Sequence, residues 1–229
     1  MIKNVKICVK SMEGNLIIND IDGISHKIFF KTSEKMSDVN NNSIQCVVTS
    51  PPYWDLKNYN VDSQIGYKET YEQYHGRLEH VWKECFRILK KDGTVWINVH
   101  SKMYNSDTVL IPQDIIKSMT KIGFFLKDIL IWHKSSGIPS GSQRLSQHFE
   151  YILFFSKQKE NFKFRKNNLD AILDYRISNL TTIGNVWNIK KKAGSISKGM
   201  PHPAIFPVEM IRRIIKVSTD ESDTVLDPF

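Results

Sequence analysis

Cysteine is scarce in this chain, and its spacing excludes two kinds of site. The sequence contains only Cys8, Cys46 and Cys85, which lie far apart. They form no CxxC pair of the kind that binds zinc, and no even set of disulfide partners. Cys46 falls in a predicted strand and Cys85 on the apolar side of a predicted helix, so both are expected to pack in the core. We expect neither a metal site nor a disulfide framework.

Long apolar runs are also missing, and acidic residues are in the minority. No run is long enough to span a bilayer, and the first residues, MIKNVKICVK, lack the apolar core and cleavage site of a signal peptide. These absences predict a cytoplasmic protein without membrane contact. The 32 Lys and Arg against 24 Asp and Glu give a formal net charge of +8. That excess favours a polyanionic partner such as nucleic acid, but a Lys- and Asn-rich composition could equally give a merely basic surface.

Short apolar stretches alternate with helical patterns along the chain. We predict a hairpin from residues 15–19 and 26–31, strands at 43–50, 94–99, 124–134, 148–157 and 223–229, and helices at 71–90, 113–122 and 206–217. The alternation predicts a single α/β domain, a three-layer sandwich with a mostly parallel sheet. Two strands that follow each other directly, 124–134 and 148–157, suggest an antiparallel edge.

Two predictions concern the ends and faces of helices. The first helix is expected to stop at Asp92-Gly93. The last helix is expected to begin near Pro207, with an inner face made of Val208, Ile211, Ile214 and Ile215.

The stretch TSPPYW, residues 49–54, raises a question of chemistry because it ends a strand, where α/β sheets gather their sites. Pro51 and Pro52 fix two φ angles, and Pro52 has no N–H to engage a carbonyl. The loop therefore presents the Ser50 hydroxyl and the Pro51 carbonyl as rigid acceptors. Two acceptors suit a nucleobase –NH₂ group, whose lone pair they help to bring out of the ring plane, while Tyr53 can stack on the base. The alternative is a rigid turn that ends a strand.

TSPPYW resembles the (D/N/S)PP(Y/F/W) motif of the amino-methylating DNA methyltransferases, most closely the serine form of the N4-cytosine enzymes. The N6-adenine enzymes of this group usually carry Asp at that position. Downstream, HPAIFPVEMIRRIIKVSTDESDTVLDPF resembles the family's HPAxFP segment, helix and VLDPF strand, which open the S-adenosylmethionine site. LKKDGTVWINV and FEYILFFSK are similar to two further segments of the family.

The order of these motifs narrows the resemblance. Only Gly14 and Gly23 precede Ser50, so no Gly-rich cofactor loop comes first. The cofactor-like segment follows the catalytic one, as in the circularly permuted β group of DNA methyltransferases. This order argues against the protein-glutamine and ribosomal-RNA methyltransferases that carry NPPY after a Gly-rich loop. A C5-cytosine enzyme needs a thiolate nucleophile, and the chain has no Pro-Cys dipeptide.

The resemblance implies a reaction and a catalytic motif. S-adenosylmethionine would give its methyl group to the exocyclic amine of a base flipped out of double-stranded DNA, as part of restriction–modification. Ser50 and the Pro51 carbonyl would hold that amine, Pro52 would stiffen the motif and Tyr53 would stack on the base. Trp54 would line the same pocket or pack beneath the loop. Cytosine N4 is the favoured target, with adenine N6 as the alternative.

The resemblance also implies cofactor contacts. Ala204 and Phe206 would border the methionine end of the cofactor, and His202 in the same segment would have a positional role. Ser33 aligns with a GDS-like segment near the adenine, although Lys31-Thr32 replaces the usual Gly-Asp. Further candidates are the first three residues of the family's DPFxGSGTT segment, namely Asp227, Pro228 and Phe229.

After DPF the family continues with a Gly-rich turn, a helix and an acidic strand that the 229-residue sequence does not contain. We therefore expect a methyltransferase domain, 1–229, that is incomplete at its C-terminus and binds S-adenosylmethionine poorly. A separate polypeptide could complete the cofactor site. The alternative is a partial, inactive remnant that binds DNA without catalysis.

Two segments are candidates for DNA contact. Residues 157–200 are basic and weakly periodic, and the β group keeps much of its target recognition at this place. They contain Lys190, Lys191 and Lys192, which could track phosphates or form a solvated face. In residues 135–147, SSGIPSGSQRLSQ, Arg144 could reach a phosphate or a guanine; the alternative there is a mobile surface loop.

Overall fold

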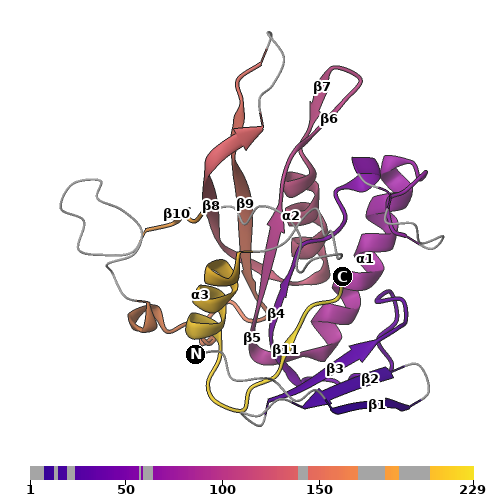
Figure 1. Cartoon of the computed structure of the whole chain (residues 1–229), viewed down its shortest axis with the longest axis vertical. Coiled ribbons are helices and arrows are strands. Elements are labelled where there is room, and N and C mark those ends of the chain that lie inside the picture. The colour runs from indigo at the N-terminus through magenta and orange to yellow at the C-terminus, as the bar shows by residue number, and fades with distance from the viewer. Residues whose placement is uncertain are drawn as a thin grey trace.

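A six-stranded mixed sheet with helices on both faces forms the centre of the computed structural model, and a separate three-stranded antiparallel sheet, β1–β3, lies beside it (Figure 1). The structure describes residues 8–12, 15–19, 24–56, 58, 64–138, 144–169, 184–190 and 207–229. The helices are α1 Tyr71–Ile88, α2 Ile111–Ile122 and α3 Val208–Ser218. The strands are β1 Cys8–Met12, β2 Asn15–Asn19, β3 Ser25–Phe29, β4 Ile44–Thr49, β5 Leu89–Val99, β6 Lys102–Tyr104, β7 Asp107–Val109, β8 Phe125–Ile138, β9 Gln147–Ser156, β10 Val186–Asn188 and β11 Val225–Leu226.

The order of the large sheet is β10-β8-β9-β5-β4-β11. The pairs β10–β8, β5–β4 and β4–β11 are parallel, whereas β9 is antiparallel to both β8 and β5. The predicted α/β fold with a mostly parallel sheet is therefore confirmed. One detail differs, because the antiparallel strand is internal and the short β10 covers the outer edge of β8. One edge of the sheet therefore contains the start of β9 and the carboxyl ends of β4, β5, β8, β10 and β11. We call it the carboxyl edge.

Two apolar layers pack on opposite faces of this sheet. Val47 of β4 faces a cluster built with α1 and α2, whereas its neighbours Cys46 and Val48 face a second cluster built with α3. This alternation follows from the two-residue period of a strand. Because β4 is buried along its whole length, the loop that follows it starts from a rigid base.

Both Cys46 and Cys85 are fully buried in these layers, as the sequence predicted. Burial raises the pKa of the Cys46 thiol to about 12 and raises that of Cys85 further still. Thiols that keep their protons are poor nucleophiles, so neither supplies the thiolate that C5-cytosine chemistry requires.

The ends of α1 and α2 show which local signals determine a boundary. Thr70 caps α1, and its side chain and that of Gln73 form a reciprocal capping box. The helix ends at Ile88 instead of reaching Asp92-Gly93 as predicted, because β5 starts at Leu89, where the chain is already extended. Helix α2 ends as predicted at Gly123, whose φ of 118° is a left-handed conformation that favours glycine.

The predicted inner face of α3 was correct at Ile214, which is buried, and at Ile211, which packs against the same core cluster, but it was wrong at Val208 and Ile215. Val208 is 61% exposed and Ile215 is 37% exposed, whereas the buried residues are Met210, Arg213, Ile214, Val217 and Ser218. An arginine on the inner face broke the apolar pattern. Its guanidinium lies 5.4 Å from the centre of the Trp187 ring and donates to Glu209 at 3.0 Å, so its charge is satisfied inside.

The first part of the basic segment lies at the edge of the sheet opposite the carboxyl edge. Lys163 pairs with Asp223 at 2.7 Å and with Asp220 at 2.9 Å, and Arg165 pairs with Asp220 at 2.6 Å. Lys90, near the start of β5, also pairs with Asp223 at 2.8 Å. These ion pairs hold the turn that leads into β11. The charges of Lys163 and Arg165, in the proposed target-recognition segment, therefore stabilise the fold.

Replacing Asp223 with asparagine should lower the stability of the fold. Its side chain is 9% exposed; partial burial acts to raise its pKa, but the hydrogen bonds from Lys163 and Lys90 prevail and lower it to about 2. Because the folded pKa lies below the unfolded one, the stabilisation is present above about pH 4 and is lost as the pH falls toward 2. We expect D223N to cost about 1–2 kcal/mol, or about 3–6 °C in a thermal melt at pH 7.

The matched control is D220N, because Asp220 is 44% exposed and should contribute much less. The loss in D223N should also shrink toward acid pH. A melting temperature of D223N within about 1 °C of the parent's would contradict this account of the turn.

Candidate active site

The TSPPYW loop leaves the carboxyl edge directly after β4, in the place that the sequence predicted. Pro51 is buried and Ser50 is partly buried. The carbonyl of Pro52 accepts from the Tyr74 hydroxyl of α1 at 2.7 Å. Within the described residues no donor reaches the carbonyl of Pro51. The Ser50 hydroxyl and the Pro51 carbonyl are thus the two acceptors that the loop offers, while Pro52 is tied to the layer of α1.

The Tyr53 hydroxyl lies at the centre of a chain of hydrogen bonds. Ser50 Oγ is 3.2 Å from the Tyr53 hydroxyl oxygen, and that hydroxyl donates to Glu150 Oε2 at 2.9 Å. Asn98 Nδ2 donates to the same carboxylate oxygen at 2.6 Å and approaches the Tyr53 hydroxyl at 3.4 Å. Lys134 Nζ donates to the other oxygen, Oε1.

Strand order explains why these side chains meet. Asn98 is near the carboxyl end of β5, Glu150 is near the start of the antiparallel β9, and Lys134 is in the last part of β8. Trp132 on β8 pairs with Glu150, and Val99 on β5 pairs with Tyr151. Three strands therefore bring a cation, an amide and a carboxylate beside the TSPPYW loop. The Glu150 and Lys134 side chains are only 14% and 15% exposed.

The hydroxyl of Tyr53 keeps its proton. Burial, followed by the nearby negative charge of Glu150, raises the pKa of Tyr53 well above its usual value. Tyr53 is therefore a neutral hydrogen-bonding group at any physiological pH.

Trp54 packs beneath the loop, which is one of the two positions considered from the sequence. Its side chain is 6% exposed and its Nε1 donates to the Glu69 carbonyl at 2.9 Å. The Tyr71 and Tyr104 rings lie 5.1 Å and 4.6 Å from it, centre to centre. Tyr104 belongs to the β6–β7 hairpin, which extends past the end of β5 (Figure 1). Contact of Trp54 with DNA stays a prediction, and it would require this packing to open.

The DPF segment lies next to the catalytic loop. Leu226 of β11 pairs with Val47 of β4, so both strands end side by side. Thr49 Oγ1 donates to Asp227 Oδ1 at 2.6 Å, and the N–H of Phe229 donates to the same oxygen at 3.2 Å. Asp227 is exposed as a residue, but nearby protein atoms desolvate its carboxyl, and this desolvation raises its pKa.

Phe229, the last DPF residue, contacts the layer of α1. The Phe229 ring lies 5.9 Å from the Trp82 ring of α1, centre to centre, with the planes at 69°. Pro228, which lies between Asp227 and Phe229 in the sequence, is partly buried. The TSPPYW and DPF motifs, which lie far apart in the sequence, are thus brought to adjacent strand ends.

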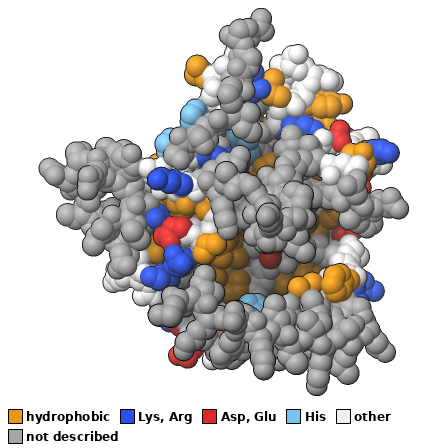
Figure 2. Space-filling view, viewed as in Figure 1, with side chains coloured by type: hydrophobic (Ala, Val, Ile, Leu, Met, Phe, Trp, Pro, Cys, Tyr) orange, Lys and Arg blue, Asp and Glu red, His pale blue; other side chains and the backbone are white. Residues whose placement is uncertain are grey.

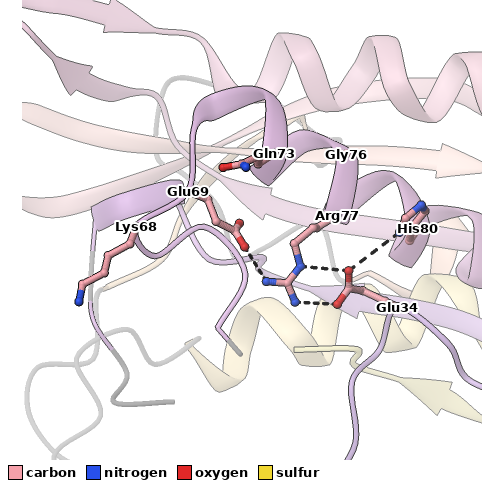
Figure 3. Close-up of a pocket in the computed structure, with 7 residues that line it drawn as sticks. All are labelled: Glu34, Lys68, Glu69, Gln73, Gly76, Arg77 and His80. Atoms are coloured by element: carbon pink, nitrogen blue, oxygen red, sulfur yellow. Dashed lines mark hydrogen bonds and ion pairs between the residues drawn. The ribbon is translucent and has the colours of Figure 1, made fainter. Parts of the chain in front are cut away.

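Ser33 is partly buried, and Figure 3 shows that the adjacent residue Glu34 is held by Arg77 of α1. Glu34 accepts from Arg77 Nη2 at 2.6 Å, and Glu69 accepts from Nη1 of the same arginine at 2.7 Å. The groove at this place is lined by Glu34, Lys68, Glu69, Gln73, Gly76, Arg77 and His80. Because two carboxylates neutralise Arg77, the groove is not suited to an anion.

Two predicted DNA contacts lie at the carboxyl edge. Arg144 is exposed in the connection between β8 and β9, and Lys190 is exposed just after β10, which runs parallel to β8. In Figure 2 the described Lys and Arg side chains lie at several separate places of the face shown. Five further predicted positions, Lys191, Lys192, His202, Ala204 and Phe206, lie outside the described residues.

Sequence reasoning missed Asn98, Lys134 and Glu150. A signal was present, because Glu150 interrupts the apolar run of HFEYILFFS, and a carboxylate in a buried strand requires partners. Which partners it finds depends on the register of β8 and β5 against β9, which a single sequence does not contain.

Comparisons with known proteins identify relatives of this chain. The profile of a protein family described as DNA methylase, the N6/N4 methylases, matches residues 44–229. Type II methyltransferase M.MjaI of Methanocaldococcus jannaschii is 31% identical, and the match covers 90% of this chain and 80% of that protein. Type II methyltransferase M.Cfr9I of Citrobacter freundii is 29% identical, and the match covers 82% of this chain and 70% of that protein.

Two proteins of known structure resemble this chain in fold. A candidate DNA modification methylase from Thermus thermophilus has a TM-score of 0.60 at 26% identity, with 86% of this chain and 77% of that one covered. The same protein has also been solved in complex with S-adenosylmethionine. The PvuII DNA methyltransferase, described as cytosine-N4-specific, has a TM-score of 0.65 at 20% identity, with 87% and 72% covered, and shares the fold.

Proposed function

We propose a specific reaction from the premise that this chain belongs to the N6/N4 DNA methylase family. As a member of the β group it is a DNA amino-methyltransferase whose cofactor is S-adenosylmethionine. The proposed reaction is transfer of the methyl group to cytosine N4 in double-stranded DNA, as the modification activity of a restriction–modification system. The observation that carries it is the contact between the two motifs: Thr49, the residue directly before Ser50, donates to Asp227 at 2.6 Å where β4 and β11 end.

The residues at this edge fit the cofactor. Asp227 uses one carboxylate oxygen, Oδ1, for the bonds from Thr49 and Phe229. The other oxygen has no partner within the described residues, so it can accept from a cationic group. S-adenosylmethionine carries an ammonium group and a sulfonium centre, and it supplies an electrophilic methyl group. The cofactor contacts proposed for Ser33, Ala204, Phe206, Pro228 and Phe229 stay predictions, as does a second polypeptide at this site.

The proposed mechanism uses the loop as a holder for an amine. The target base leaves the duplex, because its amino group is otherwise paired. Ser50 Oγ and the Pro51 carbonyl accept its two N–H groups, and the Tyr53 ring lies against the base. With both protons held, the nitrogen lone pair would leave conjugation and could attack the methyl carbon that bound S-adenosylmethionine supplies. The N–CH₃ bond would form as the S–CH₃ bond breaks, S-adenosylhomocysteine would leave, and the methylated nitrogen would then lose one proton to water. The Ser50 and Pro51 acceptors do not move in this step, since the proline ring and the Tyr74 bond fix the loop.

Analysis of the methylated product tests which base is the target. The N6-adenine enzymes usually carry aspartate where this chain has Ser50, so serine favours cytosine as the target. This preference is based on the resemblance alone, because serine and aspartate both accept hydrogen bonds and their chemistry does not distinguish the two bases. We expect N4-methylcytosine when DNA treated with the chain and cofactor is digested to nucleosides and analysed by mass spectrometry. N6-methyladenine as the sole product would replace the first assignment with the alternative.

Contact with DNA is proposed at the carboxyl edge. Arg144 and Lys190 are exposed there, on the side of β8 and β10, where a duplex could lie while a flipped base reaches Ser50. The described stretch 157–169 is turned to the opposite edge by its ion pairs with Asp220 and Asp223. An inactive remnant that binds DNA without methylation is the second candidate, and the same product analysis would support it by detecting neither methylated base.

A further inference from the structure

We propose that Glu150 is a positioning residue that sets the direction of the hydrogen bonds through Tyr53, so that Ser50 offers a lone pair to the target amine. This inference rests on the proposed function and deepens it. The observation is the buried arrangement of Ser50, Tyr53, Asn98, Lys134 and Glu150 at the carboxyl edge.

The two oxygens of the Glu150 carboxylate are acceptors only. Oε1 accepts from the Lys134 ammonium. Oε2 is left to accept from Asn98 at 2.6 Å and from Tyr53 at 2.9 Å. A hydroxyl has a single proton, so the proton of Tyr53 points to Glu150.

The direction of the next bond follows. With its proton directed to Glu150, the Tyr53 oxygen can only accept, and its 3.2 Å contact with Ser50 Oγ must be a donation from serine. The 3.4 Å approach of Asn98 Nδ2, a donor, to the Tyr53 oxygen agrees with this direction. The Ser50 proton is therefore turned away from the substrate, and the remaining lone pairs of its oxygen face outward.

This direction matters for the chemistry. If Tyr53 donated to Ser50 instead, the serine proton would be free to point at the target nitrogen. It would then compete for the lone pair that attacks the methyl group, and it would oppose the two N–H groups of the amine. A carboxylate at position 150 excludes that reversed state, whereas an amide permits it.

The variant Glu150→Gln tests the inference because it keeps the size of the side chain. Glutamine has one acceptor, and Lys134 draws the amide oxygen to itself. The –NH₂ group then faces Tyr53, which must accept from it and donate to Ser50. In methyl-transfer assays on unmethylated genomic DNA with tritium-labelled cofactor, we expect kcat to fall about tenfold or more, with KM for DNA and cofactor nearly unchanged.

The double variant Lys134→Met, Glu150→Gln distinguishes two effects of the single variant: reversal of the hydrogen bond between Tyr53 and Ser50, and loss of the ion pair with Lys134. Without the ammonium, the Asn98 –NH₂ and the Tyr53 hydroxyl draw the amide oxygen back, which restores the native direction. We expect kcat of the double variant to recover to within about threefold of the parent's. A purely structural role for the ion pair predicts a double variant no better than the single one, and that result would overturn the proposal.

Tyr53→Phe provides an independent readout if either charge variant folds poorly. In that background the chain of hydrogen bonds is already broken, so adding Glu150→Gln should change kcat less than about twofold. A further loss of about tenfold there, or a Glu150→Gln single variant with parental kcat, would refute the inference. A parent chain that methylates neither base would instead refute the proposed function itself, and with it the inference, so the two failures are distinguishable.

Discussion

Replacing Ser50 with alanine is expected to lower methyl transfer roughly 100-fold or more and to leave DNA affinity nearly unchanged. The serine oxygen accepts one N–H of the target amine only where the nitrogen approaches the methyl carbon, so its loss acts on the transition state. Removing one such fixed hydrogen-bonding partner costs on the order of 10²-fold or more in the comparable case of oxyanion-hole donors. Because Ser50 is only partly buried and makes a single described side-chain bond, to Tyr53, the fold should tolerate the change.

Single-turnover rates and DNA binding, measured on the same samples, check this expectation. Ser101→Ala is a matched control, because Ser101 lies at the same edge and its hydroxyl accepts only a long bond of 3.5 Å from Gln147. The control should keep the parental rate within about twofold. If Ser50→Ala turned over as fast as the parent, the hydroxyl would not hold the amine, and the Pro51 carbonyl would be left as the main acceptor of the loop.

The structure shows why some parts of the fold were predictable. Gly123 ends α2 because a left-handed residue is needed there, and the strands of the core are apolar on both faces. Such signals are local, since a few neighbouring residues determine them. The same holds for the loop after β4, whose position follows from a buried strand and two prolines.

Other parts depend on contacts that a single sequence does not contain. The inner face of α3 includes Arg213, whose burial makes sense only beside Trp187 of the short strand β10 and Glu209. The bonds among Asn98, Lys134 and Glu150 depend on the order β8-β9-β5. The residue types indicated which groups of the site accept hydrogen bonds. The groups that orient those acceptors come from three strands, and identifying them requires the register of these strands, which the sequence does not contain.

The second large effect is expected at Asp227, where replacement by asparagine should weaken binding of S-adenosylmethionine about 10- to 100-fold. The change keeps the shape of the side chain and an oxygen that can accept from Thr49 at the 2.6 Å position of Oδ1. It removes the charge from the other oxygen, which is proposed to meet the cationic end of the cofactor. A hydrogen bond to a charged group contributes about 1.5–3 kcal/mol, which corresponds to the stated range.

Equilibrium dialysis with labelled cofactor, carried to millimolar concentration, measures this change even where the parent binds weakly. Glu221→Gln is the control for charge, because Glu221 is exposed in the turn before β11, and its affinity should match that of the parent.

Thr49→Val separates placement from charge. Valine keeps the branched shape in the buried end of β4 but leaves Asp227 without its 2.6 Å donor. If the charge of Asp227 contributes most to cofactor affinity, Thr49→Val should lower that affinity less than Asp227→Asn does. If the placement of the carboxylate contributes most, the two variants should lower it equally.

The pH dependence provides the sharpest distinction. Desolvation by nearby protein atoms raises the pKa of the Asp227 carboxyl, so the parent loses this negative charge at a higher pH than an unperturbed aspartate would. As the pH falls, parent and D227N should therefore converge in cofactor affinity, whereas a purely steric role would keep their ratio constant. A constant ratio, or equal affinity of the two at about pH 8, would remove Asp227 from the cofactor site and leave its bonds to Thr49 and Phe229 as a clamp that joins β11 to β4.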